Sequence, residues 1–163
     1  HNSIQILNKN LELAEKQVTL ANGEDGDFSA YLIADALENA VSAFDGFGRE
    51  LCAVHAASAS NPGRAQNISF QNLTRADQRV QELFDISLSG SLDANEWEFV
   101  SRCFQKRHLF AHKMGVVDQA YIDASEDAQA VVGRKVSITP DEVTTLIAHL
   151  RHLGAHLFAG LTG

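Results

Sequence analysis

The chain has 163 residues, enough for a single domain around one hydrophobic core, and 45% of them are apolar, which excludes a disordered chain. Thirteen basic and twenty-one acidic residues give a formal charge of −8. This balance disfavours non-specific binding to nucleic acid but leaves room for a local basic pocket. No apolar run approaches the roughly 18 residues that indicate a membrane-spanning helix, and the first residues lack the pattern of a secretory signal.

Two isolated cysteines, Cys52 and Cys103, lie in apolar, helix-like stretches. Two such thiols can build neither a disulfide framework nor a four-ligand zinc site, so we interpret both as small core residues. We therefore predict no metal and no cofactor, and we take the reducing cytoplasm as the default location. We expect one domain over residues 1–163; because the chain does not begin with Met, it could be a piece of a longer protein.

Apolar residues recur at steps of three and four, which predicts α-helices along most of the chain. The first helix covers about residues 4–18 and is followed by an exposed turn at 22–26. A second helix is expected over 28–59. Gly46 and Gly48 lie in its interior, where they could permit a close helix crossing or a kink. A polar loop should then run to Asn72.

Capping residues mark the later helices. Thr74 is predicted to cap a third helix, and Asp93 a fourth that reaches about Met114. A turn and a short helix should follow over 116–126. Thr139, followed by proline and two acidic residues, is a strong start for the last helix. Because no strand alternation persists, the sequence predicts an all-α fold, an up-and-down bundle of about five helices.

The fourth helix carries a polar cluster at the end of an apolar face: Arg107, His108 and His112. An imidazole can donate or accept a proton near neutral pH, and a guanidinium can hold a phosphate through two hydrogen bonds. This pair of groups suits attack of a ribose 2′-hydroxyl on the adjacent phosphate, which needs no metal. Alternatively, the three side chains are only solvated, ion-paired or capping groups.

The stretch 104–118 resembles the signature of HEPN domains, the "higher eukaryotes and prokaryotes nucleotide-binding" superfamily. In these helical domains an arginine is followed, after four to six residues, by a histidine, and the residue after the arginine is often polar. Arg107 and His112 fit with four intervening residues, and His108 is polar. Later residues are similar to a frequent continuation of the motif: Gly115-Val116-Val117-Asp118, Tyr121, Gly133 and Ser137-Ile138-Thr139.

The resemblance implies a HEPN-like bundle and a metal-independent endoribonuclease, often of prokaryotic defence or toxin–antitoxin systems. In such enzymes two domains pair to form one composite cleft. Carried over, His112 would be the acid/base group, Arg107 the phosphate and transition-state ligand, and His108 a supporting polar group. Lys106 and Lys113, which flank the site, would either add affinity for the RNA backbone or simply be solvated. The predicted partners are RNA, a second copy of the chain, and an antitoxin or other partner protein.

An alternative reading of the same resemblance is a non-catalytic HEPN-like module that only dimerises or binds a partner protein or a nucleotide. Acidic residues of the second helix could orient Arg107 or His112 if that helix packs nearby, or could simply be solvated: Glu38, Asp45 and Glu50. Three histidines follow at steps of three and four on the last helix: His149, His152 and His156. The outer two are about 10 Å apart along the axis, so at most a pair could share a metal, and we favour a solvent-facing row.

Overall fold

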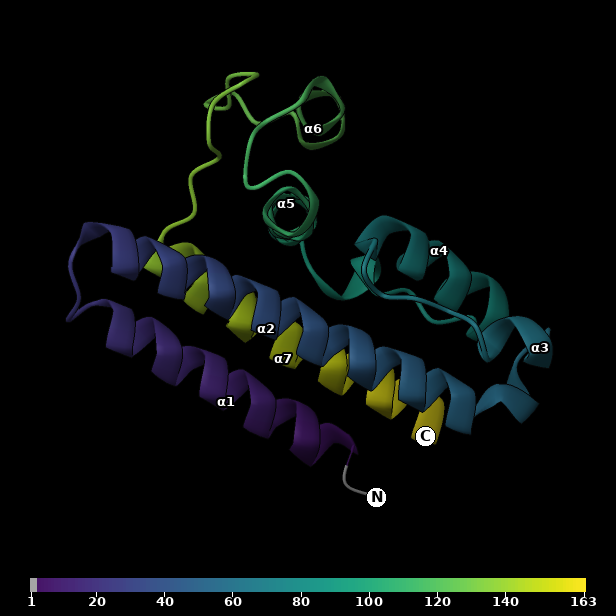
Figure 1. The fold of residues 1–163 in the computed structure, drawn as a ribbon. Coiled ribbons are helices and arrows are strands. Elements are labelled where there is room, and N and C mark those ends of the chain that lie inside the picture. The colour runs from purple at the N-terminus through teal and green to yellow at the C-terminus, as the bar shows by residue number, and fades with distance from the viewer. Residues whose placement is uncertain (1–2) are drawn as a thin grey trace.

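A computed structural model describes residues 3–163, which form seven α-helices and two short 3-10 turns (Figure 1). The all-α prediction is confirmed: the described residues contain one isolated antiparallel bridge, Val116 with Lys135, and no strand. The sequence predicted about five helices, and the described residues form seven, of which two have seven residues or fewer. The α-helices are α1 (Ser3–Ala21), α2 (Gly26–Val54), α3 (Pro62–Ala65), α4 (Leu73–Phe84), α5 (Ala94–His112), α6 (Gln119–Ser125) and α7 (Pro140–Thr162).

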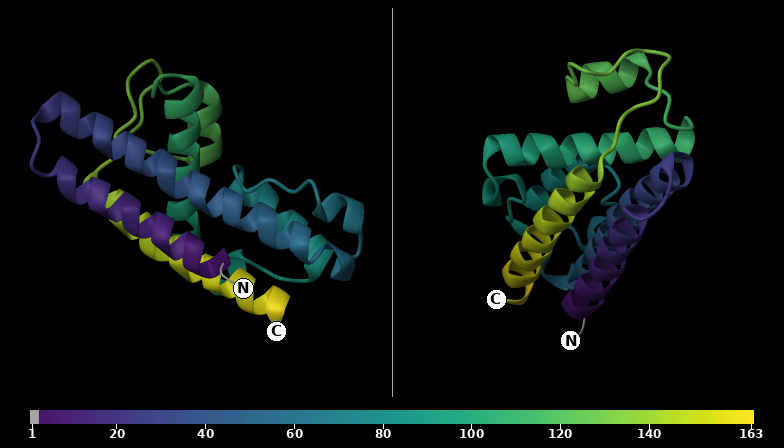
Figure 2. Two further views of the ribbon diagram at one scale, coloured as in Figure 1. Left: turned by 60° about the horizontal axis from the view of Figure 1, so that its bottom comes forward. Right: turned by 90° about the vertical axis from the view of Figure 1, so that its left-hand side faces the viewer.

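Helices α1, α2 and α7 contact one another and form the base of the molecule. α1 runs antiparallel to α2, whereas α7 runs in the same direction as α2 (Figure 1). α5 lies across α2 and α7, with α6 on its far side and α4 at its other flank (Figure 2). The predicted up-and-down order therefore describes the hairpin of α1 and α2. It does not describe α5, which crosses the base helices.

The core lies where the apolar stripes of these helices meet, around Phe44 of α2. Its ring packs edge-on against Phe70 and Phe104, with ring centroids 5.8 and 6.3 Å apart. Gly48, one turn along α2, lets Phe70 approach closely, since a Cβ added at this glycine would lie 2.6 Å from the ring. Gly48 thus admits an aromatic ring from the loop before α4 rather than the crossing helix that the sequence had suggested, whereas Gly46 faces open space.

Side-chain caps begin helices α3 to α7, whereas Asp25 before α2 makes no capping hydrogen bond with its side chain. Asp93 and Thr139 cap their helices, as predicted, and each also forms a capping box with the glutamate three residues further on. α4, however, is capped by Asn72, whose Oδ1 accepts a hydrogen bond from the backbone N of Arg75 at 3.0 Å. The predicted cap, Thr74, lies inside the helix because the buried Leu73 already belongs to it.

The end of α2 also differs from the prediction. The helix stops at Val54 rather than near residue 59, and a 3-10 turn follows. Ala56 and Ala59 in this turn are buried, so packing against the core redirects the chain before any helix-breaking residue is reached. The loop predicted before Asn72 contains the single-turn helix α3.

A small second apolar cluster fixes the segment after α5. It consists of Leu109, Val117, Tyr121 and Val136, and it holds α6 and the following loop against the C-terminal half of α5. Cys52 and Cys103 are buried free thiols in the main core, as predicted. None of the helices in residues 3–163 is long and apolar enough to cross a membrane.

The predicted solvent-facing row of histidines on α7 is confirmed only for His152, which is exposed, whereas His149 and His156 are half-buried. His152 and His156 each donate from Nε2 to a backbone carbonyl, of Ser91 at 2.8 Å and Ser87 at 2.9 Å. His149 packs against the ring of Phe99, with centroids 6.1 Å apart. His152 and His156 therefore hold the segment between α4 and α5, and His149 contacts α5 itself. Within the described residues, no group of three or more potential ligands is placed to hold a metal.

Candidate functional site

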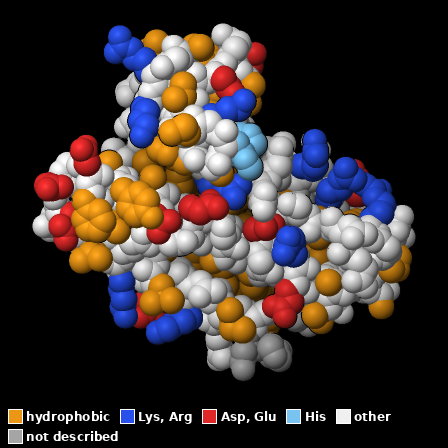
Figure 3. Space-filling view, viewed as in Figure 1, with side chains coloured by type: hydrophobic (Ala, Val, Ile, Leu, Met, Phe, Trp, Pro, Cys, Tyr) orange, Lys and Arg blue, Asp and Glu red, His pale blue; other side chains and the backbone are white. Residues whose placement is uncertain are grey.

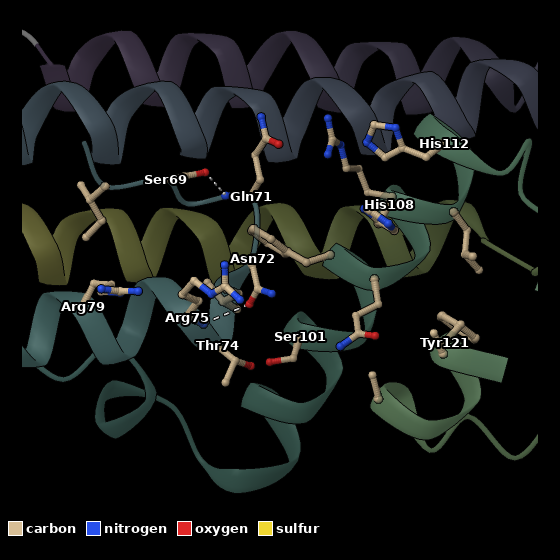
Figure 4. A pocket seen from close by; sticks show the side chains of 18 of the residues that line it. Ser69, Gln71, Asn72, Thr74, Arg75, Arg79, Ser101, His108, His112 and Tyr121 are labelled. Carbon is tan, nitrogen blue, oxygen red and sulfur yellow. Dashed lines mark hydrogen bonds between the residues drawn. The ribbon is translucent and has the colours of Figure 1, made fainter. Parts of the chain in front are cut away.

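A cleft of about 780 Å³ separates α4 and the segment before it from α5 and α6. Arg107, His108 and His112 all line this cleft, so the fold brings the predicted cluster to one cavity. Figure 4 shows the two histidines on α5, with Arg75 and Arg79 on the α4 side. The two histidines of the cluster are exposed to a ligand in this cleft, and Arg107 lines it from a buried position.

The two imidazoles lie one helical turn apart near the end of α5. Their ring centroids are 4.7 Å apart, and both side chains are exposed. The turn after His112 is closed by the backbone N of Gly115, which donates to the carbonyl of Leu109 at 2.9 Å. Two exposed, adjacent imidazoles can reach a ligand in the cleft and exchange protons with it.

Arg107 is buried, with only 9% of its surface exposed, and it is paired with Glu38 of α2. Its Nε and Nη2 atoms donate to the two carboxylate oxygens of Glu38, the second bond measuring 3.0 Å. These hydrogen bonds raise the pKa of Arg107 further above its usual range, so the guanidinium stays charged. The predicted orienting role of a second-helix carboxylate is therefore confirmed for Glu38.

The other two acidic residues of α2 form no hydrogen bond with the cluster, although the negative charge of Asp45 helps to raise the pKa of Arg107. Asp45 is buried and accepts hydrogen bonds from the backbone N of Phe70 at 2.7 Å and from Nε2 of Gln71 at 3.3 Å. It thereby holds the segment that lines the other side of the cleft. Glu50 is exposed at the surface.

The two lysines predicted to bind RNA have different surroundings. Lys106 is 5% exposed, and its Nζ donates to the carbonyl of Ser137 at 2.7 Å and to Glu142 at 3.1 Å. This buried pair ties α5 to the start of α7 and does not line the cleft, so we replace the predicted RNA contact of Lys106 with a structural role. Lys113 is exposed but outside the cleft lining, and its role stays a prediction.

Sequence reasoning missed the arginines on the opposite side of the cleft. Arg75 and Arg79 of α4 line it together with Arg64 of α3, whereas Asp118 is the one carboxylate in the lining. Figure 3 shows Lys and Arg side chains gathered over α4, with histidine beside them over α5. A chain of formal charge −8 thus folds with a basic cleft. The sequence feature that could have indicated this basic surface is the pair Arg75 and Arg79, which are four residues apart.

Comparison with known proteins adds no relative to this picture. No protein-family model, no curated protein and no solved structure matches the chain. The HEPN resemblance therefore depends on the motif around Arg107 and His112 and stays a prediction.

Proposed function

We propose that this chain is a metal-independent endoribonuclease of HEPN type, which cleaves RNA by attack of a ribose 2′-hydroxyl on the adjacent phosphate. The observation that supports this function is that Arg107, His108 and His112 open onto one cleft whose opposite side is also basic. A cleft of this charge concentrates a polyanion in a protein that otherwise repels it.

The roles follow from the chemistry of each group. An unprotonated His112 takes the proton of the 2′-hydroxyl as its oxygen bonds to phosphorus. The bond from phosphorus to the 5′-oxygen then breaks, and the protonated imidazole can return its proton to that oxygen. The products are a 2′,3′-cyclic phosphate and a 5′-hydroxyl. His108, one turn away, supports the phosphate as a polar neighbour.

Arg107 supplies the positive charge that the transition state needs. A guanidinium has five N–H groups, and Glu38 takes one from Nε and one from Nη2. The Nη1 group has no hydrogen-bond partner among residues 3–163, so it is free to donate a hydrogen bond to a phosphate oxygen. A preorientated donor of this kind stabilises charge that develops on the phosphate during the reaction.

The resemblance also implies that two copies of the chain pair and place both clusters in one composite cleft. We include this homodimer in the proposal, together with a place in a defence or toxin–antitoxin system and control by a partner protein. The second candidate is a non-catalytic HEPN-like module that uses the same charged cleft only to bind a nucleotide or partner. The exposed position of both imidazoles favours the enzyme, because binding alone would not need two proton-transfer groups.

The test is incubation of the purified chain with mixed RNAs in EDTA. We expect fragments with 2′,3′-cyclic phosphate ends, detected by mass spectrometry, and their loss in Arg107→Ala and His112→Ala. His55→Ala is the matched control, since it removes an imidazole that lies outside the cleft. Because Arg107 is buried, circular dichroism and Arg107→Lys separate loss of chemistry from loss of fold. Folded, dimeric protein without cleavage would favour the second candidate.

A further inference from the structure

The α4 side of the cleft carries two arginines that no carboxylate neutralises. Arg75 and Arg79 are one helical turn apart, and both line the cleft opposite His108 and His112 (Figure 4). Like charges at this spacing repel each other on a helix. Within residues 3–163, neither guanidinium lies within 4.0 Å of a carboxylate, in contrast to Arg107 with its partner Glu38.

The acidic residues of the same helix are occupied elsewhere. Asp77 accepts hydrogen bonds from the backbone N of Leu88 at 2.8 Å and of Ser89 at 3.2 Å. Glu82, three residues after Arg79, pairs with Arg64 at 3.3 Å instead. Because both carboxylates of α4 are bound to other groups, the positive charges of Arg75 and Arg79 are not neutralised and face the cleft.

Neutral hydrogen-bonding groups lie between the two basic sides. Thr74 of α4 and Ser101 of α5 point toward each other in the cleft (Figure 4), and Gln105 also lines it. Oγ of Ser101 is buried and has no hydrogen-bond partner among the described residues. Hydroxyl and amide groups beside arginines are the contacts that proteins use to position a sugar-phosphate backbone.

We propose that Arg75 and Arg79 form a second phosphate-binding subsite, which holds a phosphate of a single-stranded RNA other than the one that reacts. The inference rests on the proposed function for the identity of the ligand. The Arg107 side of the cleft then acts on one phosphate while the α4 side fixes the strand. Arg75 and Arg79 are positioning residues and take no part in proton transfer.

Binding and cleavage are measured separately to test this subsite. The binding probe is a fluorescein-labelled 2′-O-methyl oligouridylate of about eight nucleotides, within the roughly 4–16 that single-strand sites cover. It lacks the attacking hydroxyl, so it reports binding alone. The variant is Arg75→Gln with Arg79→Gln. Its matched control is Arg134→Gln with Lys135→Gln, which removes two charges from an exposed loop outside the cleft.

The subsite predicts at least a tenfold loss of probe affinity in the α4 double variant and little change in the control. The binding constant falls as salt rises, and loss of one phosphate contact should make the slope of log K against log salt shallower by about 0.7, the contribution of one phosphate in a single strand. In cleavage assays KM should rise while kcat changes little. An α4 variant that binds the probe with the affinity and salt slope of its control would overturn the subsite, as would a wild-type chain that does not bind the probe.

The two proposals fail in different ways. If the wild-type chain binds the probe through Arg75 and Arg79 but cleaves no RNA, the subsite stands and the nuclease proposal fails. If cleavage is present and its KM is the same in the α4 variant and the control, the nuclease proposal stands and the subsite fails. Circular dichroism of both double variants excludes loss of fold as the cause.

Discussion

Glu38 on α2 holds Arg107 on α5 through two hydrogen bonds to the same guanidinium. The pair joins the longest helix of the base to the helix that crosses it. It also has two opposing effects on the site, because the carboxylate orients the arginine and at the same time cancels part of its charge. Glu38 is 39% exposed and Arg107 only 10%, measured on the side chains, so the pair lies at the boundary between core and cleft.

Replacing the carboxylate separates these effects. Glu38→Gln should lower the free energy of unfolding by about 1–2 kcal/mol, since a buried guanidinium loses its charged partner but keeps an acceptor. The affinity for the 2′-O-methyl probe should rise about fivefold, equivalent to roughly 1 kcal/mol, because a negative charge leaves the edge of the cleft. Urea denaturation and fluorescence anisotropy measure the two changes. Glu50→Gln, on the exposed part of the same helix, should change neither.

Alanine substitutions at two glycines of α2 should change the stability of the protein in opposite directions. Gly48→Ala places a Cβ 2.6 Å from the ring of the buried Phe70, and we expect it to destabilise the protein by about 1–3 kcal/mol. Gly46→Ala meets nothing within 4 Å and should stabilise it by about 0.5–1 kcal/mol through helix propensity. The comparison is made by urea denaturation. Equal effects at both positions would contradict the packing of Phe70 on α2.

Acid should weaken the contact between α1 and α7. The hydrogen bond from Arg151 lowers the pKa of Glu15 below its usual 4.5. A lowered folded-state pKa stabilises the protein above the unfolded pKa, and this stabilisation is lost as the pH falls through the folded value. Between about pH 5 and pH 3, the wild-type urea midpoint should therefore fall more steeply than that of Arg151→Gln. Parallel midpoints in the two proteins would show that the pair contributes nothing.

The cysteines should be inert in the folded chain. Burial raises the pKa of both Cys52 and Cys103 to about 12, so almost no thiolate forms at neutral pH. Iodoacetamide at about pH 8 should label neither thiol in native protein and both in urea, where the pKa returns to about 8.5. Mass spectrometry counts the adducts. Labelling of the two cysteines at the same rate with and without urea would show that their thiols are not buried in the folded protein.

Local signals predicted most of the fold, because caps and apolar stripes depend on residues close in sequence. Asp93 and Thr139 could be identified as caps from the glutamate three positions on. The end of α2 could not, since residues 55–59 contain no helix breaker and the chain turns only because Ala56 and Ala59 pack into the core. The crossing of α5 over the base likewise depends on contacts that no single segment specifies.

The site was predictable on one side only. Arg107, His108 and His112 share a helix, so their spacing was enough to place them together. Lys106 was assigned to RNA because its partner Glu142 is 36 residues away and becomes a neighbour only in the folded chain. Arg75 and Arg79 were missed for the same reason: their cleft exists only once α4 and α5 face each other.

The last helix of the chain holds the linker between α4 and α5. A ring nitrogen that meets a carbonyl oxygen must carry a hydrogen, so His152 and His156 are both held with the proton on Nε2. The linker that joins α4 to α5 is therefore attached to α7 at two points, so the two sides of the cleft are connected through the base of the molecule as well as directly to each other.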